Sequence, residues 1–579
     1  MFSNTIKSLS KSVSAIVIAV VVGTSMASQT ASGQTRNEIE LPETEELRTG
    51  SVNVSIEQRA IERENCPFDG SDLTTNLHTV TFSSIGGEVL PASLMNSLSG
   101  VSVQSGTKAL SVVCDIRDEA NRALRRDGWI ASVQIPQQEL QNELSLQIIY
   151  ARISEIRVMG DPGPYRDILT KRLQVLKEMD PLNEKDAERI LLNISDIPGL
   201  EVRLGLAPDG GRPGEVIGNL TVTHEPYAFY LNARNYNAQR IGRETVYGRF
   251  EYYGLTGMGD VSYVGAQATA DFQEQVIVQA GHEFAIPGTD VRLAGNATYA
   301  KSKPDLGDLD LDTQALQFNI NASYPLMRTP RRRATVSGGF DYVDQTTDIG
   351  PFTLSKDSLR TLYLRGEFSG EQRRLNGAVT AAFDSFLEIR QGLNVFDATS
   401  PGQFGTSVTS GIPASRPFGV ADALVVRGMA DIFAPVTRQI GVNARVEGQW
   451  TNDPLLNFDE YSIGNLSIGR GYDPGANSGD RAIGGAFELR ATVIEKPKYD
   501  IEIFGFYDVV KTENLDAFTP EPTRVLESIG GGLRFSFNDS VRAELTYASP
   551  MDRAIFSDDV KPPDRVLFSI TTKFPSILR

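Results

Sequence analysis

The chain has few of the residues on which catalytic and metal sites are most often built. Its only histidines are His78, His224 and His282, which lie far apart and lack the spacing of metal ligands. No glycine-rich loop of the phosphate-binding type occurs. The sequence therefore offers no catalytic residue, no metal site and no cofactor site, and it argues against an enzyme.

Long apolar runs are equally scarce. The one clear run covers residues 13–23, follows Lys7 and Lys11, and precedes small residues that end at Ala27. This order predicts a secretory signal peptide over residues 1–27. The alternative, a membrane-anchoring helix, would need about 20 apolar residues. Because no later run approaches that length, the exported chain is expected to be soluble or to cross a membrane as a closed barrel.

Positive charge and cysteine are also in short supply. The formal net charge of −17 argues against a nucleic-acid partner, which needs a basic surface. The chain has two cysteines, Cys66 and Cys114, close enough in sequence to share one small domain. In an exported protein such a pair is expected to form one disulfide, and the alternative is two free buried thiols.

What the chain does contain is alternation of apolar and polar residues, from about residue 219 to residue 574. Successive side chains of a strand point to opposite faces, so each segment has one apolar and one polar face. The apolar face covers a core in a soluble sandwich, whereas it faces lipid in an outer-membrane barrel. At roughly 22 residues per strand and connection, residues 226–579 would hold about 16 strands. We expect Arg565–Phe574 to be the last strand, with these residues on its lipid side: Val566, Phe568, Ile570 and Phe574.

Two passes of strands and helices precede this region, and each predicts a small α+β domain. The first pass, residues 72–151, contains strand Asn76–Phe82, helix Val112–Leu124 ending at Gly128, and strands Ile130–Ile135 and Leu144–Tyr150. The second pass, residues 152–225, contains strand Arg152–Met159, helices Tyr165–Leu176 and Asn183–Ile194, and strands Val202–Leu206 and Val216–Val222. Residues 28–71 are polar and are interpreted as a linker or as a segment that plugs the pore.

Short motifs, in a fixed order behind the leader, carry a family resemblance. The domains contribute Cys114-Asp115-Ile116-Arg117-Asp118, Gly128-Trp129-Ile130 and Ser195-Asp196-Ile197-Pro198-Gly199-Leu200. The alternating region contributes Gly254-Leu255-Thr256-Gly257-Met258-Gly259-Asp260, Ile468-Gly469-Arg470-Gly471-Tyr472 and Gly505-Phe506-Tyr507-Asp508. Together they resemble the two-partner secretion transporters of the haemolysin/adhesin secretion-activation family (ShlB/FhaC/HecB-like), and the resemblance covers nearly all of the mature chain.

The resemblance implies a membrane all-β barrel of about 16 antiparallel strands, preceded by two small α+β POTRA domains. The barrel would lie in the bacterial outer membrane and the POTRA domains in the periplasm. The implied function is export of a large haemolysin- or adhesin-like exoprotein to the cell surface. The implied partners are this exoprotein client, outer-membrane lipid and the barrel-assembly machinery, and the chain is expected to be a monomer.

Three other functions stay open on the sequence. An outer-membrane assembly insertase shares the domains and the Arg-Gly-aromatic loop, although it usually has more such domains. A passive porin-like channel would give the two domains no client to bind. A soluble secreted enzyme on a sandwich is disfavoured by the missing catalytic residues.

The resemblance also implies a site inside the barrel. A long loop would fold into the lumen so that Arg470 pairs with Asp508 of the wall, because a planar guanidinium bonds a carboxylate through two hydrogen bonds. Gly471 would allow a tight turn, Tyr472 would pack on the wall, and Phe506 would lie beside Asp508. The alternative is a solvated external arginine, whose ion pairs are worth about 0–1 kcal/mol. The chain departs from the family at Val510, where a glycine is common, and in the residues that trail beyond Phe574.

The two domains also predict client-binding surfaces. An exposed sheet edge can add a strand from an unfolded client without requiring a particular sequence. The candidate side chains lie near two such edges and on a neighbouring helix: Val133, Ile135, Pro136, Val158, Leu169 and Leu173. The alternative is that these apolar residues form the cores of the domains.

Overall fold

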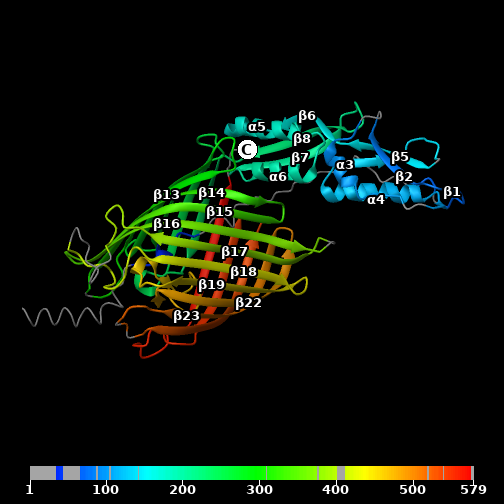
Figure 1. Cartoon of the computed structure of the whole chain (residues 1–579). Helices are drawn as coiled ribbons and strands as arrows, with labels where there is room; N and C mark the ends of the chain where they lie inside the picture. The colour runs from blue at the N-terminus through cyan, green and yellow to red at the C-terminus, as the bar shows by residue number, and fades with distance from the viewer. Residues whose placement is uncertain are drawn as a thin grey trace, which may run out of the picture.

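The structure, a computed structural model, describes residues 34–42 and 66–575, apart from residues 69, 86–88, 104–105, 141, 308, 375–376, 401–410, 518, 520 and 539. The predicted leader, residues 1–27, lies outside the described residues. A large barrel carries two small α+β units side by side at one of its ends (Figure 1). No helix in the described ranges is both long and apolar enough to span a membrane.

The first unit, called the first module, runs from β1 to β5. Its elements are β1 (Thr74–Thr75), β2 (Thr79–Ser84), α3 (Ala92–Leu98), β3 (Lys108–Ala109), α4 (Val112–Asp127), β4 (Ala131–Gln134) and β5 (Glu143–Tyr150). The main sheet has the order β2-β5-β4, and the buried faces of α3 and α4 pack in one cluster with its side chains. The predicted end of α4 is confirmed, because Gly128 caps the helix with a φ angle of 92° that favours glycine.

The second module repeats this plan and follows the first directly. Its elements are β6 (Arg152–Met159), η2 (Gly163–Tyr165), α5 (Arg166–Lys177), α6 (Glu184–Ser195), β7 (Leu200–Pro208) and β8 (Glu215–His224). The sheet order is β6-β8-β7, so β6 and β7 are its edges. Asn183 caps α6 by accepting hydrogen bonds from the backbone N–H groups of Lys185 and Asp186. The backbone of Trp129 also bridges to that of Asn183, which joins the two modules.

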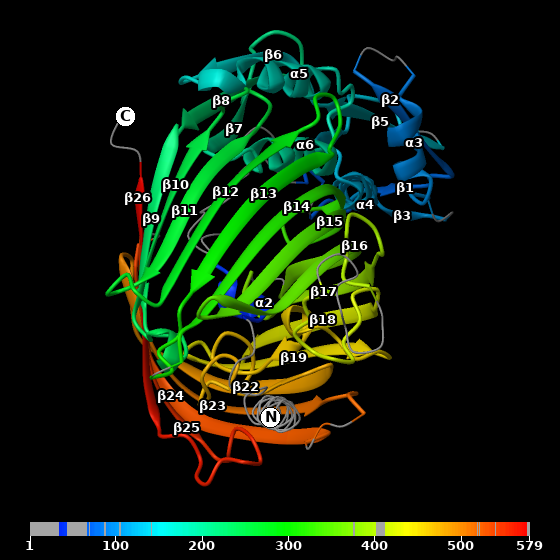
Figure 2. The same ribbon diagram turned by 90° about the vertical axis from the view of Figure 1, so that its left-hand side faces the viewer.

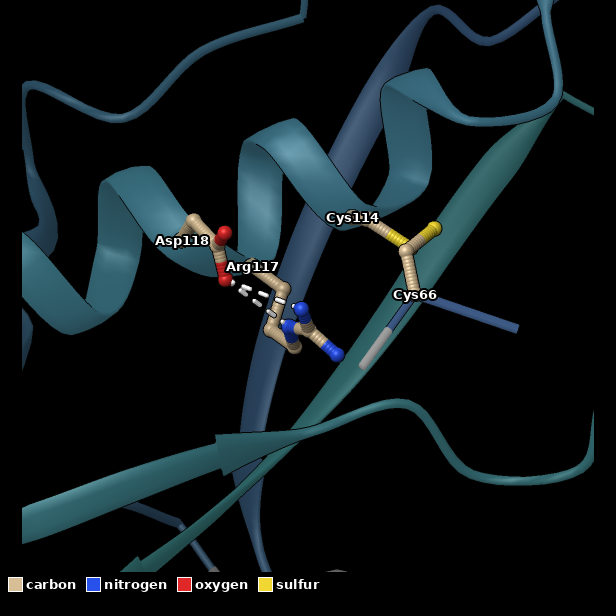
Figure 3. Close-up of a disulfide and its surroundings, with 4 residues drawn as sticks. All are labelled: Cys66, Cys114, Arg117 and Asp118. Atoms are coloured by element: carbon tan, nitrogen blue, oxygen red, sulfur yellow. Dashed lines mark hydrogen bonds and ion pairs between the residues drawn. A yellow bond between two sulfur atoms is a disulfide. The ribbon is translucent and has the colours of Figure 1, made fainter. Parts of the chain in front are cut away.

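Cys66 and Cys114 form a disulfide in the first module, as the sequence predicted, so the alternative of two free thiols is wrong (Figure 3). Cys114 lies in the first turn of α4 and is almost fully buried. Cys66 is the first described residue after the gap that follows the segment at residues 34–42. The bond therefore fastens the entry of the first module to its longest helix.

The barrel is a closed sheet of 16 antiparallel strands, in agreement with the predicted fold class. Its strands are β9 (Tyr227–Arg234), β10 (Thr245–Tyr253), β11 (Val261–Thr269), β12 (Gln275–Ala285), β13 (Arg292–Ser302), β14 (Leu311–Arg328), β15 (Arg332–Ile349), β16 (Phe352–Arg373), β17 (Val379–Gly392), β18 (Leu424–Pro435), β19 (Ile440–Thr451), β22 (Arg481–Lys496), β23 (Tyr499–Glu513), β24 (Thr523–Phe537), β25 (Val541–Pro550) and β26 (Arg565–Pro575). The last strand pairs with the first, from Ser569 opposite Arg234 to Pro575 opposite Ala228. The closed sheet leaves neither of these two strands with an unpaired edge.

The alternation in the sequence sets which face of each strand points outward. On β19, Val446 and Trp450 are about half exposed on the outer wall, whereas Asn443 and Gln449 are buried toward the lumen. On β26, Val566 and Ile570 are likewise exposed outward. An apolar exterior around a polar interior is the arrangement of a membrane barrel. The interpretation as a soluble sandwich is wrong, because the apolar faces point away from the enclosed space.

Replacing Cys114 with serine is expected to lower the free energy of unfolding of the first module by about 4 kcal/mol, because the disulfide joins residues 48 positions apart. The measurement is urea unfolding of the full-length protein, followed by the fluorescence of Trp129 after Trp450→Phe leaves it as the single tryptophan. Cys66→Ser should give the same loss, and the double variant no more. Linked peptides are expected in mass spectra of the unreduced protein. Equal stabilities, or two free thiols, would contradict the disulfide.

Candidate functional site

A long loop between β19 and β22, residues 452–480, folds into the barrel and is called the lumen loop. It contains the short helix η4 (Asn457–Asp459) and a stem in which β20 (Tyr461–Ser462) pairs with β21 (Ser478–Gly479). The apolar side chains near its tip, which include Ile463, Ile468 and Tyr472, are buried with wall residues in one cluster. Leu456 and Phe458 near its start are buried in a second cluster. The wall thus holds the loop from the stem to the tip.

Arg470 at the tip of the lumen loop is bonded to Asp508 on β23. Its Nη2 lies 2.8 Å from Oδ1 and its Nε 3.0 Å from Oδ2, and its backbone N–H also donates to Oδ2 at 3.0 Å. The guanidinium lies 3.6 Å from the centre of the Phe506 ring. The carboxylate of Asp508 is 2% exposed and the side chain of Arg470 is 18% exposed, which is not the setting of a solvated external arginine.

Arg470 also bonds a second carboxylate that sequence reasoning missed. Its Nη1 lies 2.7 Å from Oε2 of Glu488 on β22. Glu488 is bonded in addition to Arg490 at 2.7 Å and to Arg534 at 2.6 Å. The period-two pattern could have revealed this set, because Glu488 and Arg490 lie on the same inward face of β22 and the register places Glu488 opposite Phe506.

Gly471 and Tyr472 fix the tip against β24 and β25, the strands that follow β23 in the barrel. A Cβ on Gly471 would lie 2.8 Å from both the backbone N of Pro550 and the Cβ of Ser528, so close packing excludes any larger residue. Gly471 does not have the left-handed φ angle of a turn glycine, and the turn comes from Gly469, whose φ is 112°. The Tyr472 hydroxyl donates to the Glu527 carbonyl at 2.9 Å.

Val510, the residue that departs from the family pattern, supports the same loop. It is 1% exposed and belongs to the buried cluster of the loop. A Cβ on Gly484 would approach both Val510 and Ile468, so the larger wall side chain on β23 lies opposite a glycine on β22. The departure therefore adds apolar contact at the base of the tip and leaves the bond between Arg470 and Asp508 in place.

Residues 34–42, called the lumen segment, also lie inside the barrel, with α2 (Arg36–Ile39) as their helical turn (Figure 2). Arg36 bonds Asp459 of the lumen loop at 3.1 Å and Asp341 of the wall at 3.4 Å. The amide of Gln345 donates to the carbonyl of Gln34 at 2.7 Å. The lumen segment and the lumen loop are therefore joined to each other as well as to the wall.

Arg416 holds the base of the lumen loop to two other loops. It bonds Glu460 at 2.6 Å and Asp480 at 2.5 Å, and it also bonds Asp516 in the connection between β23 and β24. Burial raises the pKa of the Glu460 carboxyl to about 7, although Arg416 opposes the shift. A protonated Glu460 reduces the excess of negative charge around Arg416, so the cluster is expected to be firmest below that pH.

The second module is fixed to one end of the barrel. Arg328 at the end of β14 bonds Asp196 after α6 at 2.7 Å, and the Tyr165 hydroxyl donates to the carbonyl of Asp260 at 3.1 Å. Gly254, the first residue of the motif at residues 254–260, allows the barrel and the module to approach closely. A Cβ at this position would lie 2.3 Å from Pro164 of the module. In the Ile197-Pro198-Gly199 motif, a Cβ on Gly199 would lie 2.5 Å from the ring of Tyr253.

The candidate client-binding residues divide into buried and accessible ones. Val133, Leu169 and Leu173 lie in the cores of the modules, 6% exposed or less. Ile135 and Pro136 are half-buried after β4. Val158 is 43% exposed on the edge strand β6, so it is the member of the set that a client can reach.

The sequence and the fold are both similar to those of known proteins. A model of the family described as "Haemolysin secretion/activation protein ShlB/FhaC/HecB" matches residues 217–535 of the 579. The heme/hemopexin transporter protein HuxB of Haemophilus influenzae (strain 86-028NP) is 21% identical over 471 residues, which cover 78% of this chain and 79% of HuxB.

Solved structures show the same fold. CdiB from Escherichia coli matches with a TM-score of 0.69 and 15% identity, over 92% of this chain and 96% of CdiB. BamA from Haemophilus ducreyi lacking POTRA domains 1-3 matches with a TM-score of 0.50 and 11% identity, over 86% of this chain and all (100%) of that one.

Arg470→Ala is expected to loosen the lumen loop, because it leaves the buried carboxylate of Asp508 without a cationic partner in the described part of the chain. Such a loss costs roughly 3–5 kcal/mol, so amide hydrogen exchange of residues 461–479 should accelerate by roughly two to three orders of magnitude. Exchange is measured by mass spectrometry on the full-length protein. Arg490→Ala is the matched control, because Arg490 bonds Glu488 from the wall. Unchanged protection in Arg470→Ala would contradict this role.

Proposed function

The chain belongs to the ShlB/FhaC/HecB family of haemolysin secretion/activation proteins, and on that premise we propose that it exports an unfolded partner exoprotein through its barrel to the cell surface. The barrel lies in the outer membrane. Residues 72–151 and 152–225 would be POTRA domains in the periplasm, and residues 226–579 the barrel. The observation that supports export best is a lumen that holds the lumen segment and the lumen loop, both bound by hydrogen bonds and ion pairs.

The lumen contents would act as a removable plug. The lumen segment and the lumen loop share the ion pair between Arg36 and Asp459, so displacement of one weakens the hold on the other. Their remaining contacts include polar bonds to wall side chains, which water can replace when the segment leaves. The proposal gives the chain no catalytic step, and the work of transport would come from folding of the client outside the cell.

Clients would first meet the second module at β6. Among the described strands this one pairs only with β8, so its other edge would be open to an extended chain. Val158 and Met159 are exposed near the end of β6 and offer apolar contact beside that edge. Backbone pairing would accept many sequences, which suits an unfolded client.

Two alternatives make different predictions. A passive porin keeps an aqueous lumen, whereas this lumen holds the segment and the loop. An assembly insertase would act on many barrels, and the fold likeness to BamA alone does not separate the two activities. The range of proteins that depend on this chain therefore decides between export and insertion.

Deleting the gene is expected to remove one large exoprotein from the cell surface and to leave other outer-membrane proteins at their normal abundance. Quantitative proteomics of the surface and the culture fluid makes the measurement. The wild-type gene should restore the exoprotein, whereas Arg470→Ala should not, although its barrel reaches the outer membrane. A general fall in barrel proteins would favour the insertase, and no change at all would refute export.

Val158→Lys is expected to reduce export severalfold, because a charged side chain on an edge strand opposes pairing with another chain. The matched control is Val175→Lys, which places the same charge on the exposed face of α5. Export is read as the amount of the exoprotein identified by the deletion, relative to the amount of transporter in the membrane. If both variants export normally, or both fail equally, the client does not use the β6 edge.

A further inference from the structure

The side chains on the inner wall of the barrel differ in chemistry from one group of strands to the next. From β16 onward the inward side chains are rich in charge, and examples are Glu388, Arg390, Arg427, Glu447, Glu488 and Arg534. On β12 to β15 the inward positions carry amides and hydroxyls at mid-height, and this amide wall consists of Gln275, Gln279, Asn296, Thr298, Gln317, Asn319, Asn321 and Gln345. Its charged exceptions, Glu283, Arg292 and Asp341, are in ion pairs.

The amide wall already holds a peptide by its main chain. The amide of Gln345 donates to the carbonyl of Gln34 at 2.7 Å, and that of Gln275 donates to the carbonyl of Glu38 at 3.4 Å. Both bonds reach backbone oxygens, which every residue of any polypeptide carries. These two contacts therefore do not depend on the side chains of the lumen segment.

More of the amide wall faces open space next to the lumen segment. A cavity of about 480 Å³ lies between the segment and the wall, and its lining includes Asn296 and Gln317. These two amides are half-buried, and neither makes a hydrogen bond to any residue that the structure describes. Each amide has donors and an acceptor, so both can bond a second stretch of main chain in the cavity.

We propose that the amide wall of β12 to β15 binds the main chain of the extended client during export, and that the lumen segment occupies part of this track until a client replaces it. The proposal rests on the proposed function and adds the surface along which the client moves. Single neutral hydrogen bonds are worth about 0.5–1.5 kcal/mol net, so they can be broken one at a time as the chain slides. The charged part of the wall, from β16 onward, would instead select particular sequences and hold them.

The test uses the full-length protein in planar lipid bilayers, with Arg36→Ala as the parent because it removes both ion pairs of the lumen segment. The probe is an unfolded, uncharged polypeptide of serine, threonine and glycine, and the readout is the dwell time of its current blockades. Gln317→Leu and Asn296→Leu are each expected to shorten the dwell time about fivefold, because each removes hydrogen bonds of the size given above. Gln317→Asn, which keeps an amide, should restore most of the loss.

The matched control is Gln314→Leu, the same chemical change three residues away on the outward face of β14. It should leave the dwell time at the parent value. Absence of blockades, equal dwell times in the parent and both wall variants, or equal shortening by Gln314→Leu would overturn the proposal. The probe is not the exoprotein, so the two proposals can fail separately. If the wall variants shorten the dwell time but gene deletion removes no exoprotein, the track is kept and export is rejected. If gene deletion removes an exoprotein but the dwell times are unchanged, export is kept and the track is rejected.

Discussion

A closed sheet in lipid has no unpaired backbone edge, and the cost of closure with 16 strands is a lumen too wide for wall side chains to fill. The rest of the structure answers that constraint. The lumen loop and the lumen segment fill the space, and the side chains that hold them come from strands far apart in sequence. Arg36 alone joins residue 341 of the wall to residue 459 of the loop.

Hydrogen bonds and ion pairs, together with buried apolar clusters, hold the lumen loop and the lumen segment to the wall. The pair between Arg470 and Asp508 is stable while both groups are shielded, because the desolvated charges satisfy each other. Glu488 differs from Asp508 in this respect, since Arg490 and Arg534 keep it paired when the loop moves. Among the described residues, departure of the loop would therefore leave Asp508, but not Glu488, without a cationic partner.

Much of the fold could be predicted because it depends on local patterns. Period-two alternation gave the inward and outward faces of β19, β25 and β26, and helical spacing gave α4, α5 and α6. The site was less predictable. A four-residue helix such as α2 has no periodicity to detect, and its partner Asp459 lies 423 residues further along the chain. The predicted client-binding surface was also partly wrong. The apolar spacing of Leu169 and Leu173 arises because their helix packs on the core of its own module.

Transport of an unfolded chain places opposite demands on the lumen wall. The wall must compensate the backbone groups of the client, because an extended chain in a narrow space loses water on several sides, yet it must not hold any segment so firmly that movement stops. Neutral amides meet both demands, as they donate and accept with modest net gain. A guanidinium wall would bind acidic stretches strongly and repel basic ones. The bonds from Gln345 and Gln275 to the backbone of the lumen segment are a small example of such compensation, because they satisfy main-chain carbonyls that any polypeptide carries.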